Sequence, residues 1–267
     1  MTLVDLIRKC VTPSSRPCVN ISGGIDSTIV LHHLCEKSEE QVCTYTVGFL
    51  GQETEFAYAQ QVSDHYGTFH KEVVIDNMLC RYPEILRFMD APRFNLWPFW
   101  VAEQQAKDGV KNCYIGEGGD EHFGGYWYKP ACSYPERWSH LFQYVDPTYT
   151  QIYKHFKINL HAPLHPDCLD WHKTLEYFDS AEQKRFLKKA YKGVIPKFVL
   201  NRQKLNGRKD YSVIWRKELQ QHFPNEKPQT EQDIIRLLNI WTTKTWLNTR
   251  IVKTHKTLHK LGGNRRC

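Results

Sequence analysis

The first half of the chain alternates short apolar runs with amphipathic segments. Runs rich in β-branched and aromatic residues predict buried strands, and they lie at 17–21, 42–49, 68–75 and 112–115. Segments with apolar side chains at helical spacing predict helices, and they lie at 27–36, 53–66, 77–89 and 97–109. Strands that alternate with helices in this way predict an α/β fold, with a parallel sheet flanked by helices on both faces.

The pattern changes after about residue 127, where aromatic residues, prolines and charges dominate and strand signals fade. Residues 181–191 and 233–250 have a helical pattern. Because no Gly/Ser-rich linker separates the halves, we expect a single domain over 1–267. Within it, 1–127 would form an α/β core and 128–267 a mainly helical C-terminal elaboration.

Composition places the chain among folded globular proteins. Hydrophobic residues make up 41% and charged residues 24% of the 267 positions, which argues against a mainly disordered chain. A net charge of +7 permits polyphosphate, nucleotide or nucleic-acid partners without requiring any of them. The sequence has neither a run of 18 apolar residues nor a signal-peptide pattern at its start. We therefore expect a cytoplasmic protein with no membrane association.

The sequence has nine cysteines, which is an odd number. No two of them have the spacing of a CxxC motif. A zinc site or a disulfide framework is therefore disfavoured. Buried thiols in a reducing compartment are the simpler interpretation.

A glycine-serine loop follows the first predicted strand. It contains Ser22, Gly23, Gly24, Asp26 and Ser27. The two glycines permit a tight turn close to an anion, and the helix that follows directs backbone N–H groups and a positive dipole end at it. A carboxylate beside phosphates requires a cation between them, so the loop indicates a polyphosphate site with Mg²⁺. An ordinary strand–turn–helix connection is the alternative, and the Gly-Lys of a Walker A loop is absent.

A second glycine-rich loop follows the fourth predicted strand. It holds several glycines and three carboxylates, those of Glu117, Asp120 and Glu121. Such a loop is costly for folding alone, because glycines lose entropy and like charges repel. In an open α/β sheet the ligand crevice lies at the carboxyl ends of the strands. Both loops are therefore expected to face one site.

Both loops resemble those of known proteins. The first is similar to the pyrophosphate loop of the ATP pyrophosphatase (PP-loop) superfamily. The second is similar to the Ser-Gly-Glu-Gly-Ser-Asp-Glu-x-Phe-Gly-Gly-Tyr signature of the asparagine synthetase synthetase domain. Further segments resemble that domain in its own order, at 45–49, 55–70, 90–92 and 199–204. The resemblance covers about residues 15 to 210.

This resemblance implies an adenine nucleotide alpha hydrolase-like fold that uses ATP and Mg²⁺. It implies adenylation of a carboxylate with release of pyrophosphate, followed by transfer of ammonia or an amine. Phosphate contacts would come from Ser22, Gly23, Gly24 and Ser27, Mg²⁺ contacts from Asp26 and Asp120, and nucleoside contacts from Ile21, Val47, Ile115 and Gly116. Glu117 would act as general base, and Lys204 would neutralise the departing pyrophosphate.

The sequence also departs from the family's pattern. Ile115 and Gly119 stand where the family has serine. Segment 161–167 replaces the family's Arg-Val-Pro-Phe-Leu-Asp and introduces His161 and His165. We interpret this as an altered carboxylate pocket, in preference to a metal triad with Asp167, so that L-aspartate as the substrate is in doubt.

The length fits a synthetase domain and leaves no room for a glutaminase domain of similar size. The nitrogen would then come from free ammonia, from a separate glutaminase subunit, or from another amine.

Two alternatives remain open at this point. A PP-loop enzyme that modifies nucleic-acid bases shares the first loop and fits the basic stretch at 250–266. A non-catalytic nucleotide-binding module would fit the altered 161–167 segment.

Overall fold

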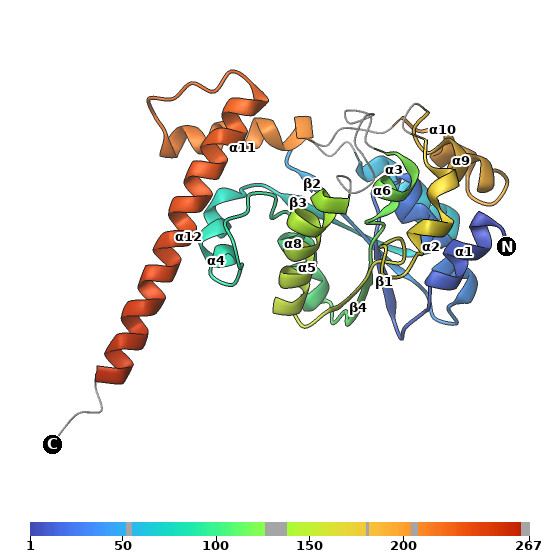
Figure 1. The fold of residues 1–267 in the computed structure, drawn as a ribbon, viewed down its shortest axis with the longest axis horizontal. Helices are drawn as coiled ribbons and strands as arrows, with labels where there is room; N and C mark the ends of the chain where they lie inside the picture. The colour runs from blue at the N-terminus through green and yellow to red at the C-terminus, as the bar shows by residue number, and fades with distance from the viewer. Residues whose placement is uncertain (52–54, 126–137, 180–181, 204–207, 263–267) are drawn as a thin grey trace.

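A five-stranded parallel sheet forms the centre of the protein (Figure 1). The computed structural model describes residues 1–51, 55–125, 138–179, 182–203 and 208–262, without the side chains of 208–214 and 252–262. The strands are β1 (Pro17–Asn20), β2 (Cys43–Phe49), β3 (Phe69–Ile75), β4 (Asn112–Tyr114) and β5 (Asn159–His161), in the order β3-β2-β1-β4-β5. The predicted α/β fold with a parallel sheet flanked by helices is confirmed.

Helices cover both faces of this sheet. One face carries α1 (Leu3–Cys10), α2 (Ile25–Lys37), α3 (Phe56–Tyr66), α9 (Arg185–Ala190) and α10 (Lys197–Asn201). The other carries α4 (Tyr82–Leu86), α5 (Pro98–Lys107), α8 (Asp146–His155), α11 (Arg208–His222) and α12 (Glu231–Gly262). Shorter pieces are η1 (Leu79–Arg81), α6 (Gly119–Phe123), the π-helical turn η2 (Leu141–Val145), η3 (Trp171–Lys173) and η4 (Leu175–Tyr177).

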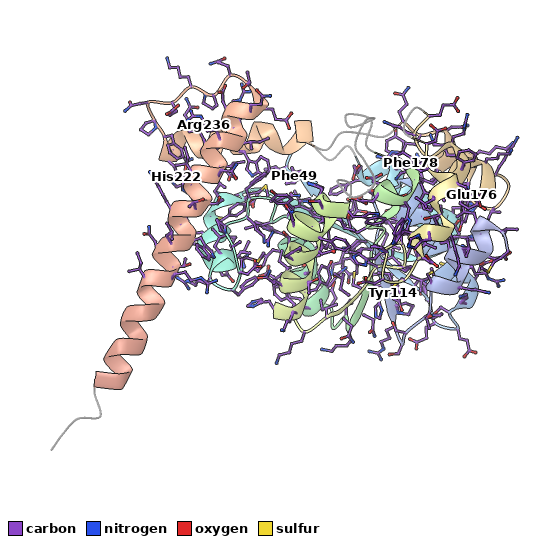
Figure 2. The ribbon with its side chains drawn as sticks, in the orientation of Figure 1. Phe49, Tyr114, Glu176, Phe178, His222 and Arg236 are labelled. Carbon is purple, nitrogen blue, oxygen red and sulfur yellow. The ribbon has the colours of Figure 1, made fainter. Side chains whose placement is uncertain are left out.

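Successive strand residues supply two separate hydrophobic cores. Cys18 and Cys113 face the core under α5 and α8, whereas their neighbours Val19 and Tyr114 face the core under α2. Side chains alternate between the two faces of a strand, so a strand buried on both faces is apolar throughout. This accounts for the continuous apolar runs in the sequence, and Figure 2 shows Tyr114 within the packed central part.

The predicted strands in the first half match β1 to β4 within one or two residues. The helix predicted at 77–89 is divided into η1 and α4, and Pro83 stands at the start of α4. The sequence shows no strand signal at 159–161, where β5 extends the sheet beside β4. β5 has three residues and none is fully buried, so it lacks the run of buried apolar residues that marks β1, β2 and β4.

The C-terminal helices pack at the edge of the molecule, where α12 runs past α4 (Figures 1 and 2). The Trp246 indole N–H donates to the Met89 carbonyl at 3.1 Å, and the rings of Tyr82 and Trp241 lie 5.8 Å apart. The buried Glu218 carboxylate of α11 accepts the backbone N–H groups of Met78 and Leu79. These contacts attach the helical elaboration to the α4 side of the sheet.

The seven cysteines in the described ranges are free thiols. Cys18 and Cys113 are buried, whereas Cys80 and Cys168 are exposed. The expectation of buried thiols therefore holds for only part of the set. Among the helices that the structure describes, none combines the length and the hydrophobicity needed to traverse a bilayer.

Candidate active site

The strand order places both glycine loops at one crevice. β1 pairs with β2 on one side and with β4 on the other, so the direction of winding reverses between β1 and β4. At such a reversal the loops that leave the carboxyl ends of the strands diverge and leave a ligand crevice. A cavity of about 640 Å³ opens here, and both loops line it.

The two loops pack directly on each other. A Cβ atom added to Gly116 would lie 2.8 Å from the backbone nitrogen of Ser27. One added to Gly119 would lie 2.5 Å from a carboxylate oxygen of Asp26. Both positions therefore lack a side chain because the first loop occupies the space. At Gly119, where the resemblance leads one to expect serine, the missing side chain makes room for the Asp26 carboxylate.

The first loop forms the N-terminus of α2, with Gly24 as its N-cap. The hydroxyls of Ser27 and Thr28 donate back to the Gly24 carbonyl at 3.3 Å and 2.7 Å. In the described structure no side chain caps this helix end. The positive end of α2 therefore faces the cavity, as an anion site requires.

Gly23 has a different role from its neighbours. It adopts a φ of +70°, and an added Cβ would lie 2.6 Å from the Cβ of Tyr58 on α3. Gly23 is not among the residues that line the cavity. Its backbone shapes the loop and fits closely against α3.

We expect Gly23→Ala to lower the free energy of unfolding by about 1–3 kcal/mol through backbone strain, with the collision at Tyr58 adding to it. Gly51→Ala is the matched control, because Gly51 has a φ of +75° and no atom of the described residues lies within 4 Å of its added Cβ. Urea denaturation gives the loss in free energy of unfolding for each variant. The loss in Gly51→Ala reports backbone strain alone, and the excess loss in Gly23→Ala reports the collision with Tyr58. Equal losses would contradict the close fit against Tyr58.

Lys184 joins the carboxylates of the two loops. Its ammonium forms ion pairs with Asp26 and Asp120, and the residue is only 4% exposed. Burial alone would lower the pKa of Lys184, but the charges of Asp120 and Asp26 raise it well above its ordinary value. The lysine therefore stays charged between two carboxylates.

Lys184 was not predicted as a site residue from the sequence, although residues 181–191 have a helical pattern. Lys184 precedes α9 with a φ of +59°, a conformation that non-glycine residues seldom adopt. This backbone geometry directs its side chain inward, whereas Lys189 on the same helix is exposed. No local signal in the sequence distinguishes these lysines.

The same cluster suits a divalent metal ion. Asp26 and Asp120 approach each other closely enough for one ammonium group to contact both. Carboxylate oxygens are the ligands that Mg²⁺ prefers. The ammonium marks where a cation is stabilised, so both residues fit the Mg²⁺ role that the resemblance implies for them.

Arg202 supports the first loop from α10. Its guanidinium donates to the Ser22 carbonyl, lies 3.3 Å from a Glu55 oxygen, and stacks 4.2 Å from the centre of the Tyr58 ring. The neighbouring Asn201 and Gln203 line the cavity. Lys204, the predicted phosphate ligand, lies outside the described residues, so its role stays a prediction.

The predicted nucleoside contacts lie on the wall of the same cavity. They are Ile21, Val47, Ile115 and Gly116. Three further side chains that were not predicted for the nucleotide site join them: Trp97, Val101 and Tyr149. Trp97 and Tyr149 meet edge to face, with ring centres 5.8 Å apart. Together these residues give the cavity apolar walls, while Asp26, Asp120 and Lys184 give it charged ones.

Glu117 lies where this cavity meets a second one. The second cavity has about 650 Å³ and shares Ile115, Glu117 and Tyr149 with the first. Its other walls include Lys154, Lys157 and His165. A carboxylate at the junction can therefore reach a molecule held in either cavity.

The 161–167 segment forms part of the second cavity without forming a metal site. His165 pairs with Asp146 at 2.9 Å and with Asp167 at 3.3 Å. His161 instead stacks on Tyr114, with ring centres 4.5 Å apart. Within the described ranges, these residues do not group at metal-ligand spacing, so the triad alternative receives no support.

The charge of His165 should make stability depend on pH. Burial would lower its pKa, but the hydrogen bond to Asp146 and the charges of Asp146 and Asp167 raise it overall. A histidine whose folded pKa is raised stabilises the fold fully below about pH 6.5, and this contribution is lost as the pH rises through the folded value. We therefore expect His165→Gln to lower the melting temperature more at pH 5.5 than at pH 8. An equal loss at both values would contradict the charged pair.

Comparisons with known proteins give one family and several relatives. The family model described as "Asparagine synthase" matches residues 2–167. A Mycobacterium tuberculosis protein named "Putative asparagine synthetase (glutamine-hydrolyzing)" is 34% identical over 111 residues, 40% of this chain and 17% of the relative. "Asparagine synthetase (glutamine-hydrolyzing) 3" of Arabidopsis thaliana is 31% identical over 127 residues, 41% of this chain and 22% of the relative. The matches thus span about a fifth of these relatives' length.

Among solved structures, the chain is similar to the U34-tRNA thiolase NcsA from Methanococcus maripaludis with its [4Fe-4S] cluster. The TM-score is 0.38 at 16% identity, over 88% of this chain and 77% of the thiolase.

Proposed function

The chain belongs to the asparagine synthase family, and on this premise we propose that it is an ATP-dependent ligase that forms an amide bond. It adenylates a carboxylate, releases pyrophosphate, and transfers ammonia or an amine to the adenylate. The observation that carries this proposal is the joining of Asp26 and Asp120 by Lys184 at the positive end of α2.

ATP would bind with its phosphates beside the cluster of Asp26, Asp120 and Lys184 and with its nucleoside against the apolar walls of the cavity. The loop from Ser22 to Ser27 contributes the helix N-terminus, and Lys184 contributes a buried positive charge. A preorganised cation can stabilise the negative charge that develops as pyrophosphate leaves. In this proposal Lys184 shares that task with Lys204.

Asp26 and Asp120 would hold Mg²⁺, which when bound neutralises phosphate charge and polarises the leaving group. The ammonium of Lys184 would then shift from the carboxylates toward the phosphates. Asp26 and Asp120 would then be paired with Lys184 in the absence of nucleotide and with Mg²⁺ in its presence. This exchange of cations also accounts for a fully buried lysine in a cavity that must accept a polyanion.

Glu117 would act as the general base. An amine that attacks an acyl-adenylate must lose a proton, and a carboxylate within reach of the nitrogen can accept it. Its place at the junction of the two cavities supports this role, because the adenylate would form in the first cavity. The second cavity would then admit the nitrogen donor, with free ammonia, a separate glutaminase subunit and a larger amine as the candidate sources.

The carboxylate substrate is an open choice within this proposal. L-Aspartate is the first candidate by family, but His161 stacks on Tyr114 where the family's pattern has arginine. The experiment is pyrophosphate release from ATP and Mg²⁺ with ammonia and a panel of carboxylates that includes L-aspartate. We expect release that depends on one carboxylate. Failure of every carboxylate to elicit pyrophosphate, with ATP shown to bind, would refute the ligase activity.

A further inference from the structure

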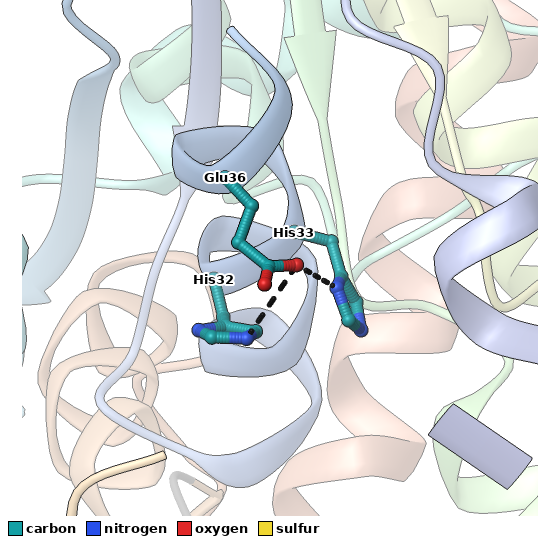
Figure 3. A group of neighbouring side chains, drawn as sticks. All are labelled: His32, His33 and Glu36. Carbon is teal, nitrogen blue, oxygen red and sulfur yellow. Dashed lines mark hydrogen bonds and ion pairs between the residues drawn. The ribbon is translucent and has the colours of Figure 1, made fainter. Parts of the chain in front are cut away.

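A second polar cluster lies on α2, toward the end opposite the glycine loop (Figure 3). It consists of His32, His33 and Glu36, whose nearest side-chain nitrogen and oxygen atoms all lie within 4.8 Å of one another. In the part of the chain that the structure describes, this is the one group of three such residues at that spacing. We propose that these three side chains form a binding site for a divalent transition metal, best matched to Zn²⁺. The site is separate from the proposed ligase activity.

Helical geometry brings the three side chains together. Glu36 follows His32 by four residues and His33 by three, so its carboxylate lies one turn beyond both imidazoles. Its Oε2 atom is 2.9 Å from Nδ1 of His33 and 3.7 Å from Nε2 of His32. Ligand atoms around tetrahedral zinc lie about 3.4 Å apart at ordinary bond lengths. The two observed distances fall on either side of that value, and the two imidazole nitrogens lie within 4.8 Å of each other, so side-chain rotation has to draw the three atoms together.

The remaining ring nitrogens already have the partners that metal-binding histidines require. Nε2 of His33 lies 2.8 Å from the Tyr191 hydroxyl, and Nδ1 of His32 lies 3.4 Å from the Tyr66 hydroxyl. Such outer contacts fix the orientation and tautomer of a metal-bound imidazole. In both rings the nitrogen that faces Glu36 is thereby left to act as the ligand.

The protonation states also suit metal binding, which requires neutral imidazoles and an ionised carboxylate. Burial lowers the pKa of both His32 and His33. Burial would raise the pKa of Glu36, but the hydrogen bond from His33, the charges that His32 and His33 carry when protonated, and Arg8 lower it overall. The Arg8 guanidinium, 3.7 Å from Glu36 and itself 54% exposed, would move into solvent when the metal enters.

Solvent can reach the cluster from the Glu36 side, since that side chain is 39% exposed and His32 is 14% exposed. Two histidines and one glutamate are a donor set that zinc accepts, with water in the fourth position. A metal here would link the C-terminal half of α2 to the tyrosines of α3 and α9. Its expected consequence is a more stable protein, since a ligand that binds only the folded form raises the melting temperature.

Zinc titration of the chelator-treated protein by calorimetry tests the site. We expect one equivalent to bind and to raise the melting temperature. His32→Ala and Glu36→Gln each remove a direct ligand and should weaken that affinity by at least the roughly 10-fold to 100-fold that loss of an outer-shell partner costs. His172→Ala is the control, because it removes an exposed histidine that lies outside the cluster. Absence of zinc binding, or equal affinity in all four proteins, would overturn the proposal.

Cobalt titration of the unmutated protein gives a second test that does not depend on how the variants fold. Nitrogen and oxygen ligation at this cluster should produce visible d–d absorption without a near-ultraviolet thiolate band. A thiolate band would assign the metal to cysteines and overturn the proposal, as would the absence of any visible absorption.

Discussion

Lys184→Met should destabilise the nucleotide-free protein by about 3–5 kcal/mol, the usual cost of removing one partner from a buried ion pair. The substitution leaves Asp26 and Asp120 close together without the ammonium that they share. Their repulsion should decrease when either carboxylate is protonated, so the loss should be smaller at acid pH. Denaturant titration at pH 7 and pH 5 measures both effects.

Mg²⁺ provides a further expectation for the same variant. Because the two carboxylates suit a divalent cation, millimolar Mg²⁺ should stabilise Lys184→Met more than it stabilises the unmutated protein. Pyrophosphate release should fall by about 10²–10³-fold even so, since the fixed charge beside the phosphates is gone. Lys189→Met is the matched control, on the same helix and exposed. If Lys184→Met were as stable and as active as Lys189→Met, the cluster would not have the role that we assign to it.

Glu117→Gln should separate the two halves of the proposed reaction. Glutamine keeps the shape of the side chain but cannot accept a proton, so transfer of nitrogen should slow by about 10²–10⁴-fold. Adenylation does not need this base, so carboxylate-dependent exchange of labelled pyrophosphate into ATP should stay close to the unmutated rate. The two rates are measured on the same protein samples.

Glu39→Gln serves as the control, since Glu39 is an exposed glutamate remote from both cavities. A parallel fall in exchange and in amide formation would place Glu117 in the phosphate and metal cluster instead. No fall in either would remove it from the reaction.

The sequence predicted those parts of the fold and site that have local signals. β1, β2 and β4 are largely buried and stand out in the sequence as apolar runs, whereas β3, at the edge of the sheet, is recognised by its β-branched and aromatic residues. The two glycine loops are recognisable in the sequence because clustered glycines and carboxylates are costly for folding alone. Their meeting at one crevice followed from the rule for parallel sheets, and the close approaches at Gly116 and Gly119 agree with it.

The parts that the sequence missed depend on tertiary context. β5 has no apolar run, and pairing with β4 makes it a strand. Lys184 is one of several lysines in and just before α9, and its left-handed backbone conformation and its pairing with Asp26 and Asp120 appear only in the folded chain. The junction of two cavities at Glu117 involves residues from α8 and β5 that no motif connects to it.

The central claim is that this crevice activates a carboxylate by joining it to the α-phosphate of ATP. It is tested most directly with a carboxylate substrate labelled with ¹⁸O, found in the panel described above, and mass analysis of the products. Attack on the α-phosphate predicts that one labelled oxygen appears in AMP, together with unlabelled pyrophosphate. Label in orthophosphate with ADP as the other product, or AMP without label, would contradict the claim.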